Sequence, residues 1–328
     1  MKRMVIDMLG GDNSLNMSKE AVALFHKEYP LVPLLLVGPK DELKEFSDCK
    51  IIDATEVVPM ECGALEALRH RSSSLVKAIN AMKEENGGAI VSAGSTGALL
   101  SLSAIILKKI PGVLRPALVT AFPKLNKENE YVTLLDVGAS SENTKEELAQ
   151  FALMGSLYSK IVYSKEKPLV KLLSNGEEEG KGSTLSKETY VLLKDDQRIN
   201  FGGNVEGNGI LLGDADVVVS DGFSGNIMLK STEGAAKGVG VLLKKMFLSS
   251  LSTKIGYLFS KKGVKKLKET LDPKKVGGAL LIGVNGIVVK AHGNSDAYAF
   301  KNALVLAYKL LEEDICQKIS EGLYKEKE

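Results

Sequence analysis

Short apolar runs alternate with amphipathic stretches along most of the chain. The runs are rich in Val, Ile and Leu and have the length of β-strands that are buried on both faces. The stretches between them repeat apolar residues at helical spacing, often after a Ser or Thr. This order predicts βαβ units in an α/β fold with a mainly parallel sheet flanked by helices. The expected strands lie within residues 3–9, 33–38, 88–93, 116–122, 131–138, 168–176, 216–222 and 277–293.

One segment, from Val241 to about Leu271, departs from this alternation. Its apolar residues have helical spacing, and lysines and serines fill most other positions. The pattern predicts a basic amphipathic helix that is broken near Gly263 and stops before Pro273. We therefore expect a helical hairpin inserted at about 240–275. Its apolar side chains include Phe247, Leu251, Ile255, Leu258 and Phe259.

The length permits either one large α/β domain or two smaller ones, and we expect a single α/β catalytic domain over residues 1–328 that carries this insertion. A chain of 328 residues with 44% hydrophobic content can bury a large core. The formal net charge is +2, but residues 244–275 hold ten lysines against two acidic residues, a local +8 that leaves −6 elsewhere. The basic character is therefore confined to one segment, and we expect no nucleic-acid partner.

Cysteine and histidine usage gives no sign of a metal site. Cys49, Cys62 and Cys316 have no CxxC spacing and form an odd set, which favours a reducing cytoplasm over a disulfide framework. The three histidines are far apart and lack a metal-binding motif, so no protein-held metal is expected. The sequence also lacks a signal peptide and an apolar run long enough to span a bilayer. These features predict a cytoplasmic protein.

Glycines and small polar residues follow several of the expected strands. In the stretch VSAGSTGALL, Gly94 and Gly97 leave peptide N–H groups uncovered, and Ser95 or Thr96 can cap a helix from about Ala98. Because ligands of parallel sheets bind beyond the carboxyl ends of strands, we expect these loops to line a single cleft. Their composition suits an oxyanion such as phosphate. The polar residues concerned are Asp12, Asn13, Ser95, Thr96, Asn175, Lys181, Asn204, Asp221, Ser224 and Asn226.

Each of these residues, taken alone, is better explained as a helix cap or a turn residue. Six such loops together favour a ligand site. The sequence has no dinucleotide motif and no phosphate-binding P-loop, so no nucleotide cofactor is expected. It also has no G-x-S-x-G elbow or Cys/His pair, so we expect no covalent nucleophile on the protein.

The set of loops resembles the PlsX-type phosphate acyltransferases of bacterial phospholipid synthesis, from Asp7 to about Leu304. The resemblance implies a three-layer fold like those of isocitrate dehydrogenase and phosphotransacetylase, a homodimer and no cofactor. It implies transfer of a fatty acyl chain from acyl carrier protein to inorganic phosphate, giving acyl phosphate for glycerol 3-phosphate acylation. The segments that carry it are MLGGDN, SAGSTGALLSLS, IPGVLRPAL, LLDVGAS, LLSNGEEEGKG, GNVEG, DVVVSDGFSGNIMLK and KAHGNSDAYAFKNAL.

The residue types suit that chemistry. Phosphate is largely a dianion at pH 7, and it can attack a thioester once it is positioned and partly desolvated. We expect Lys181 and the backbone around Gly94–Gly97 to hold phosphate, with Asp12 and Asn13 nearby. We expect Asn204 and Asn226 to orient phosphate or to donate to the carbonyl oxyanion. We expect Asp221 to accept a proton or to orient Lys181.

The hairpin has two open interpretations. Its lysines suit anionic lipid headgroups or the acidic carrier protein, with Leu258 and Phe259 entering the membrane interface. Such a peripheral protein would meet a membrane surface or a membrane glycerol-phosphate acyltransferase. Alternatively, the helices pack between two subunits.

Three other functions stay as alternatives. A phosphate acetyl or butyryl transferase would use coenzyme A thioesters in place of the carrier protein. A dehydrogenase with an isocitrate dehydrogenase-like fold needs a metal cluster or nucleotide motif that the sequence lacks. A peripheral membrane scaffold would leave the polar loops unexplained.

Overall fold

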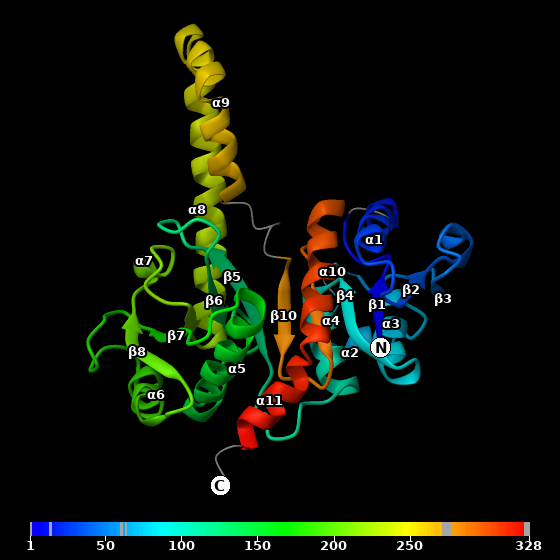
Figure 1. Ribbon diagram of the computed structural model, residues 1–328, viewed down its shortest axis with the longest axis horizontal. Coiled ribbons are helices and arrows are strands. Elements are labelled where there is room, and N and C mark those ends of the chain that lie inside the picture. Colours follow the sequence, from blue (N-terminus) through cyan, green and yellow to red (C-terminus); the bar gives the residue numbers. More distant parts are fainter. Residues whose placement is uncertain (1, 13–14, 60–61, 63, 271–276, 325–328) are drawn as a thin grey trace.

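The computed structural model describes residues 2–12, 15–59, 62, 64–270 and 277–324. In this part of the chain one sheet has the strand order β3-β2-β1-β4-β11-β10-β5-β6-β9-β7-β8 (Figure 1). The strands are β1 (Arg3–Asp7), β2 (Leu34–Gly38), β3 (Lys50–Asp53), β4 (Gly87–Ser92), β5 (Ala117–Pro123), β6 (Tyr131–Leu135), β7 (Leu169–Leu173), β8 (Asn200–Val205), β9 (Val217–Val219), β10 (Ala279–Ile282) and β11 (Ile287–Lys290).

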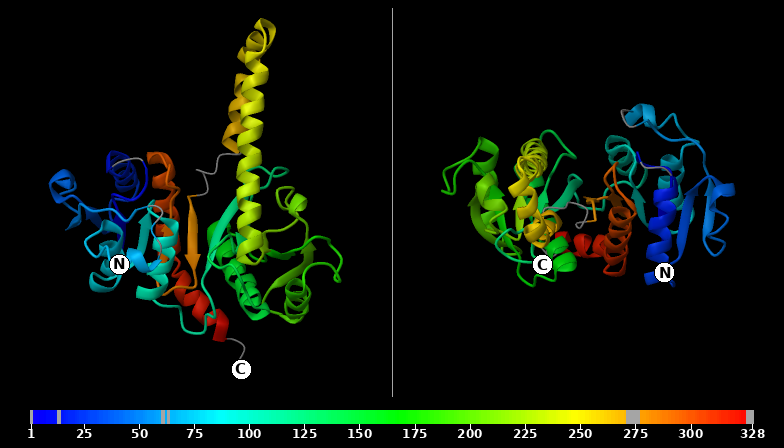
Figure 2. Two further views of the ribbon diagram at one scale, coloured as in Figure 1. Left: turned by 180° about the vertical axis from the view of Figure 1, so that it is seen from behind. Right: turned by 90° about the horizontal axis from the view of Figure 1, so that it is seen from above.

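Helices cover both faces of the sheet, as the expected three-layer arrangement requires (Figure 2). They are α1 (Leu15–Glu28), α2 (Ala64–Ala67), α3 (Ser74–Glu84), α4 (Thr96–Ile106), α5 (Lys145–Tyr163), α6 (Thr184–Asp195), α7 (Gly207–Ile210), α8 (Gly222–Leu248), α9 (Leu251–Thr270), α10 (Ala297–Glu312) and α11 (Ile315–Tyr324), with a 3₁₀ turn η1 (Lys40–Leu43).

Strand β1 illustrates why the apolar runs are continuous. Met4 and Ile6 pack into the cluster that holds the buried faces of α1, α5, α10 and α11, whereas Val5 packs into the cluster with α3 and α4. Successive side chains of a strand point to opposite faces, so a strand covered on both faces needs apolar residues at every position. The prediction of strands buried on both faces is confirmed here.

The sheet is mainly parallel but reverses direction in its middle. Strands β1 to β4 and β11 pair in parallel, and so do β6 to β9. Between these two blocks, β11–β10, β10–β5 and β5–β6 are antiparallel pairs. Three successive reversals leave the two blocks running in opposite directions.

Two strands lie outside the predicted runs. β3 is a short edge strand with exposed ends, and β8 has the sequence NFGGNV. Both lack a continuous apolar pattern, and glycine and asparagine are poor strand residues. The run at 277–293 holds two strands, β10 and β11, which pair as a hairpin.

Helices α8 and α9 form a hairpin that projects from the body of the molecule (Figure 1). The break lies at Ser249 and Ser250, so the predicted break near Gly263 is wrong. Ser250 Oγ accepts from Thr253 N at 3.1 Å, and Ser250 N donates to Thr253 Oγ1 at 3.0 Å. This reciprocal cap begins a new helix, whereas a single glycine in a helix only weakens it.

The ends of the hairpin also differ from the expected insertion. Helix α8 begins at Gly222, directly after β9, so its first turns belong to the body of the fold. At the far end the rings of Phe247 and Tyr257 meet edge to face, with centroids 5.2 Å apart, and join the two helices. None of the helices that the structure describes combines the length and apolar character needed to cross a bilayer.

Candidate functional site

The first group of predicted site residues surrounds the start of α4. Ser95 is the N-cap, and its Oγ accepts from Ala98 N at 3.4 Å, so the helix begins at Thr96. Gly94 is buried against Gly10, where an added Cβ would lie 2.6 Å from Gly94 N. Gly97 is exposed and faces open space. The absence of a side chain at Gly10 therefore lets the backbone of the Gly94 turn pack closely against it, whereas Thr96 and Gly97 present the exposed positive end of the helix.

A series of hydrogen-bonded, buried polar side chains holds this turn in position. Ser92 Oγ donates to Asp7 Oδ2 at 2.6 Å and accepts from Gly94 N at 3.0 Å. Asp7 is fully buried, and burial raises the pKa of its carboxyl group. Hydrogen bonds that are buried away from water thus link the turn after β4 to the end of the neighbouring strand β1.

Lys290, at the end of β11, completes this group. Its Nζ donates to Ala93 O at 3.0 Å and also to Ala291 O. Burial lowers the pKa of the Lys290 ammonium to about 8, against the opposing effect of Asp7 and Asp12. The sequence alone does not mark Asp7, Ser92 and Lys290 as site residues, because each stands inside or at the end of an apolar run.

Asp12 lies at the same turn, and its backbone N donates to Gly293 O at 2.9 Å. Its side chain is exposed and acts on Lys290 electrostatically. The predicted Asn13 lies outside the described residues. Asp12 therefore stands in the neighbourhood that the sequence predicted.

The second group is built around Asp136, directly after β6. This buried carboxylate accepts five hydrogen bonds and thereby shapes the loop up to Ser140. The start of α8 packs on this loop, because a Cβ at Gly222 would lie 2.6 Å from Asp136 Oδ2. The donors to Asp136 are Leu118 N, Gly138 N, Ala139 N, Ser140 N and Ser140 Oγ.

Asp221 and Asn226 belong to the start of α8. Asp221 is the N-cap, and its Oδ1 accepts from Ser224 N at 2.8 Å. Its carboxylate is therefore already engaged in capping, which was the alternative to its predicted role toward Lys181. Asn226 is exposed, and its side chain lies beside Gly138, where an added Cβ would be 3.2 Å from Asn226 Cγ.

Lys181 lies on the exposed loop between β7 and α6. Asn175 Oδ1 accepts from Gly182 N at 2.9 Å and closes this loop. Asn204 lies within β8 and not in a loop, and its Nδ2 donates to Glu178 O at 2.8 Å. Its buried Oδ1 has no hydrogen-bond partner among the described residues. Asn204 thus supports the loop that carries Lys181.

The expectation that all these loops follow one edge of the sheet is wrong. The first group follows β1, β4 and β11, and the second follows β6, β7 and β9, which run in the opposite direction. Hydrogen bonds link residues within each group: Ser92 bridges Asp7 and Gly94 in the first, and Asn204 holds the Lys181 loop in the second. The strand pattern alone does not reveal direction, because parallel and antiparallel strands can share the same apolar run.

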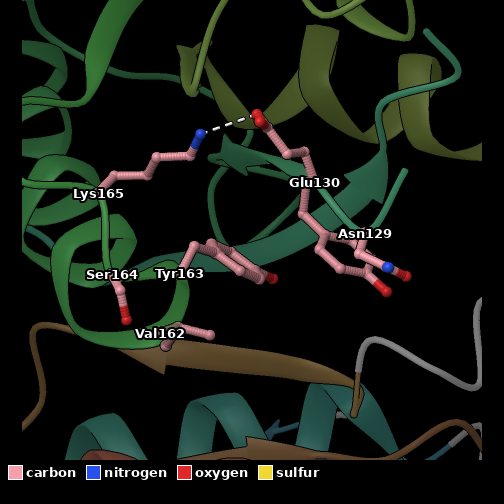
Figure 3. Close-up of a pocket in the computed structure, with 7 residues that line it drawn as sticks. Asn129, Glu130, Val162, Tyr163, Ser164 and Lys165 are labelled. Atoms are coloured by element: carbon pink, nitrogen blue, oxygen red, sulfur yellow. Dashed lines mark hydrogen bonds and ion pairs between the residues drawn. The ribbon is translucent and has the colours of Figure 1, made fainter. Parts of the chain in front are cut away.

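An open hollow of about 460 Å³ lies at the start of β6 and the end of α5. Figure 3 shows Lys165 and Glu130 pointing toward one another above Tyr163, and their charged atoms are 2.8 Å apart. Tyr131 and Tyr163 stack with ring centroids 5.3 Å apart. None of the residues that line this hollow belongs to the predicted site.

Two trios of potential metal ligands occur among the described residues, at His26, Asp48 and Cys49 and at Cys62, Glu66 and His70. In the first trio His26 Nε2 lies 3.0 Å from Asp48 Oδ2, so these two side chains already contact one another. Burial raises the pKa of the Cys49 thiol to about 11, which disfavours the thiolate that binds metal. Neither trio includes a residue of the predicted site.

Known proteins show which family the chain belongs to. A family described as "Fatty acid synthesis protein" matches residues 2–318. The chain belongs to this family. A relative named phosphate acyltransferase from Fervidobacterium nodosum is 43% identical over 98% of both chains. Another of that name from Exiguobacterium sibiricum is 41% identical over 97% of this chain and 98% of its own.

Solved structures with a similar fold have little sequence in common with this member of the family. A phosphotransacetylase from Streptococcus pyogenes is similar over 95% of this chain and 94% of its own, with a TM-score of 0.59 and 16% identity. A branched-chain phosphotransacylase from Enterococcus faecalis V583 covers 94% of this chain and 99% of its own, with a TM-score of 0.57 and 16% identity. The expected phosphotransacetylase-like fold is confirmed.

Proposed function

We propose that this chain is a phosphate acyltransferase that moves a fatty acyl chain from acyl carrier protein to inorganic phosphate. The observation that carries the proposal is the likeness to phosphate acyltransferases over nearly the full length of both chains, 43% identical for the Fervidobacterium nodosum relative. Membership of a fatty acid synthesis family supports an acyl substrate. We further propose that residues 1–328 act as one α/β catalytic domain.

We place phosphate at the start of α4. Thr96 and Gly97 are exposed there, their N–H groups belong to the first helical turn and have no acceptor within the helix, and the helix dipole favours an anion. The buried links between Asp7, Ser92 and Gly94 hold this turn in one shape, so binding requires little reorganisation.

Lys181 and Asn226 complete the proposal from the second group. Both side chains are exposed and free to meet a bound acyl substrate. For Lys181 to neutralise phosphate and Asn226 to donate to the oxyanion that forms on the thioester carbonyl, the second group would have to come within reach of the anion at α4, although the two groups follow strands that run in opposite directions. Asn204 would act through the Lys181 loop, which it holds at Glu178 O. Asp221 would orient the start of α8 through its cap.

The reaction then needs no nucleophile from the protein. A phosphate oxygen attacks the thioester carbonyl carbon, the C–S bond breaks, and the products are acyl phosphate and the carrier-protein thiol. The leaving thiolate takes a proton from monohydrogen phosphate or water, since a free thiol has a pKa of about 8.5. Positioning and charge neutralisation supply the catalysis.

The decisive experiment measures release of carrier-protein thiol from a long-chain acyl carrier protein with and without inorganic phosphate. We expect release only with phosphate, together with acyl phosphate in equal amount. Parallel assays with acetyl- and butyryl-coenzyme A test the alternative transferase. Faster turnover of the coenzyme A thioesters would replace the proposed acyl donor, and thiol release without phosphate would contradict the proposed reaction.

The α8–α9 hairpin supports a second contact surface. Leu258 and Phe259 are 69% and 87% exposed, which is unusual for apolar side chains of this size. We propose that this surface meets an anionic membrane, a membrane glycerol-phosphate acyltransferase or a second subunit, and that the protein is cytoplasmic and peripherally membrane-associated. Phe247 differs, because it is partly covered by Tyr257.

Vesicle co-sedimentation separates these partners. If the surface with Leu258 and Phe259 enters lipid, Leu258→Glu should abolish binding to anionic vesicles and leave the oligomeric state unchanged. If the same surface joins two subunits, Leu258→Glu should dissociate the dimer in sedimentation analysis. Ser260→Glu, on the same exposed helix, controls for the added charge.

A further inference from the structure

We propose that Lys290 is a positioning residue for phosphate, which acts by holding the turn at Gly94–Gly97 through the Ala93 carbonyl. The proposal rests on the proposed function, which places phosphate at this turn. It assigns a role to a lysine that begins the segment KAHGNSDAYAFKNAL and for which the sequence predicts no role.

The sheet places Lys290 beside the turn. Strand β11 runs parallel to β4 with Lys290 opposite Ser92, and Ala291 N donates to Ser92 O at 2.9 Å. From there Lys290 Nζ reaches Ala93 O at 3.0 Å. Ala93 O and Gly94 N belong to the same peptide unit, and Gly94 N donates to Ser92 Oγ at 3.0 Å. This peptide is therefore held at both its oxygen and its nitrogen, which fixes the direction of the N–H groups that follow.

Burying a lysine at this position costs desolvation free energy that a merely structural contact would not require. Only 7% of Lys290 is exposed, and taking an ammonium group out of water costs several kcal/mol. The buried Lys124 shows how the same fold neutralises such a charge, since its Nζ lies 2.7 Å from the Asp216 carboxylate. Lys290 Nζ instead donates to two neutral carbonyl groups, of Ala93 and Ala291. Asp7 and Asp12 act on this ammonium group through charge attraction and without a hydrogen bond to it, so part of its positive charge remains available at the turn, where a dianion would bind.

The charged groups around Lys290 agree with this role. Asp7 faces it from β1, Asp12 from the turn after β1, and His292 follows on its own segment. Burial lowers the pKa of Lys290 to about 8 in spite of the two carboxylates. A bound phosphate dianion would stabilise the ammonium form, so phosphate binding and protonation of Lys290 are linked.

Two variants test the proposal. Lys290→Met removes the charge and the hydrogen bonds, and Lys290→Gln keeps a donor without the charge. We expect both to raise the KM for phosphate about tenfold or more, the range for one charge-assisted contact, with the KM for acyl carrier protein within about twofold of wild type. The matched control is Lys124→Met, which replaces another buried lysine, directly after β5 and paired with Asp216, and should leave the KM for phosphate unchanged.

The outcomes separate this proposal from the proposed function. If the wild-type protein shows no phosphate-dependent thiol release, the proposed function fails. If it does, and both folded Lys290 variants keep the wild-type KM for phosphate, Lys290 is a structural lysine and the positioning role is overturned. A KM that rises equally in Lys124→Met also overturns it, because general loss of stability then explains the effect.

A measurement on the wild-type protein decides the matter if the Lys290 variants do not fold. Inorganic phosphate becomes more completely the dianion as the pH rises above 7.5, so its own titration would lower its KM over this range and not raise it. The KM for phosphate should rise about fivefold or more between pH 7.5 and 9 as Lys290 loses its proton. A flat profile over this range overturns the proposal.

Discussion

Gly225 on α8 faces the backbone carbonyl oxygen of Asp136 with no room for a side chain between them. An added Cβ would overlap that oxygen and lie 2.5 Å from Ser220 Oγ. Because both obstacles belong to packed strand ends, α8 would have to shift. We expect Gly225→Ala to lower the free energy of unfolding by about 1–3 kcal/mol, the usual cost of overpacking, as measured by denaturant titration.

Gly234, further along α8, provides the control for this substitution. An added Cβ there meets nothing within 4 Å. Since alanine is the better helix former by about 1 kcal/mol, Gly234→Ala should stabilise the protein slightly or leave it unchanged. Equal effects of the two substitutions would show that helix propensity decides, and not the contact with Asp136.

The Asp136 carboxylate predicts a second effect on stability. Its oxygens accept five hydrogen bonds from the loop up to Ser140 and from Leu118 N. Asp136→Asn keeps the shape but turns an NH₂ group toward donors, so several N–H groups lose their acceptor. We expect a loss of about 2–4 kcal/mol in unfolding free energy. Asp41→Asn, at an exposed carboxylate, should change it by less than about 0.5 kcal/mol, and a similarly small effect at Asp136 would show that the loop does not depend on this charge.

Lys181 predicts an effect on turnover without one on stability. It is exposed on its loop, so Lys181→Ala should leave the thermal midpoint unchanged. If it neutralises phosphate in the transition state, phosphate-dependent thiol release should fall about 10²-fold to 10³-fold. Lys187→Ala, an exposed lysine of α6, is the matched control and should retain wild-type activity. Full activity of Lys181→Ala would remove this residue from the mechanism.

The lowered pKa of Lys290 predicts how the free energy of unfolding depends on pH. Burial lowers its pKa from 10.5 to about 8, so between these values the unfolded chain binds more protons than the folded one. The free energy of unfolding therefore rises with pH across this window, by about 3 kcal/mol in total if the shift is complete. The comparison is wild type against Lys290→Met in denaturant titrations at pH 7 and pH 10, since other groups cancel in the difference. A difference that stays constant with pH would mean that Lys290 titrates normally.

Much of the fold could be read from local pattern. The apolar run of β1 is buried on both faces because alternate side chains enter different clusters, as the continuous run predicted. Ser95 caps α4 as expected, since a hydroxyl at that position satisfies an otherwise unpaired helix N–H. The hairpin insertion was also visible, but its break depends on the reciprocal cap between Ser250 and Thr253, a signal that was present in the sequence and overlooked.

The site was less predictable because it depends on contacts between distant segments. Lys290 stands at the end of an apolar run, and its role arises only when β11 lies beside β4. Asn204 looked like a loop residue because the strand around it contains two glycines. The sequence predicts a catalytic role for Asp221 and also allows a helix cap, and the structure shows the cap.

The sequence by itself determined which segments become strands and helices and which loops are rich in glycine and polar groups, because these properties depend on residues close in the chain. The tertiary structure decided the direction in which the strands run, and so which loops become neighbours. Three antiparallel pairings in the middle of the sheet separate the Gly94 turn from the loops of Lys181 and Asp221. Such pairings depend on hydrogen bonds between strands far apart in sequence, and a local pattern of apolar residues carries no record of them.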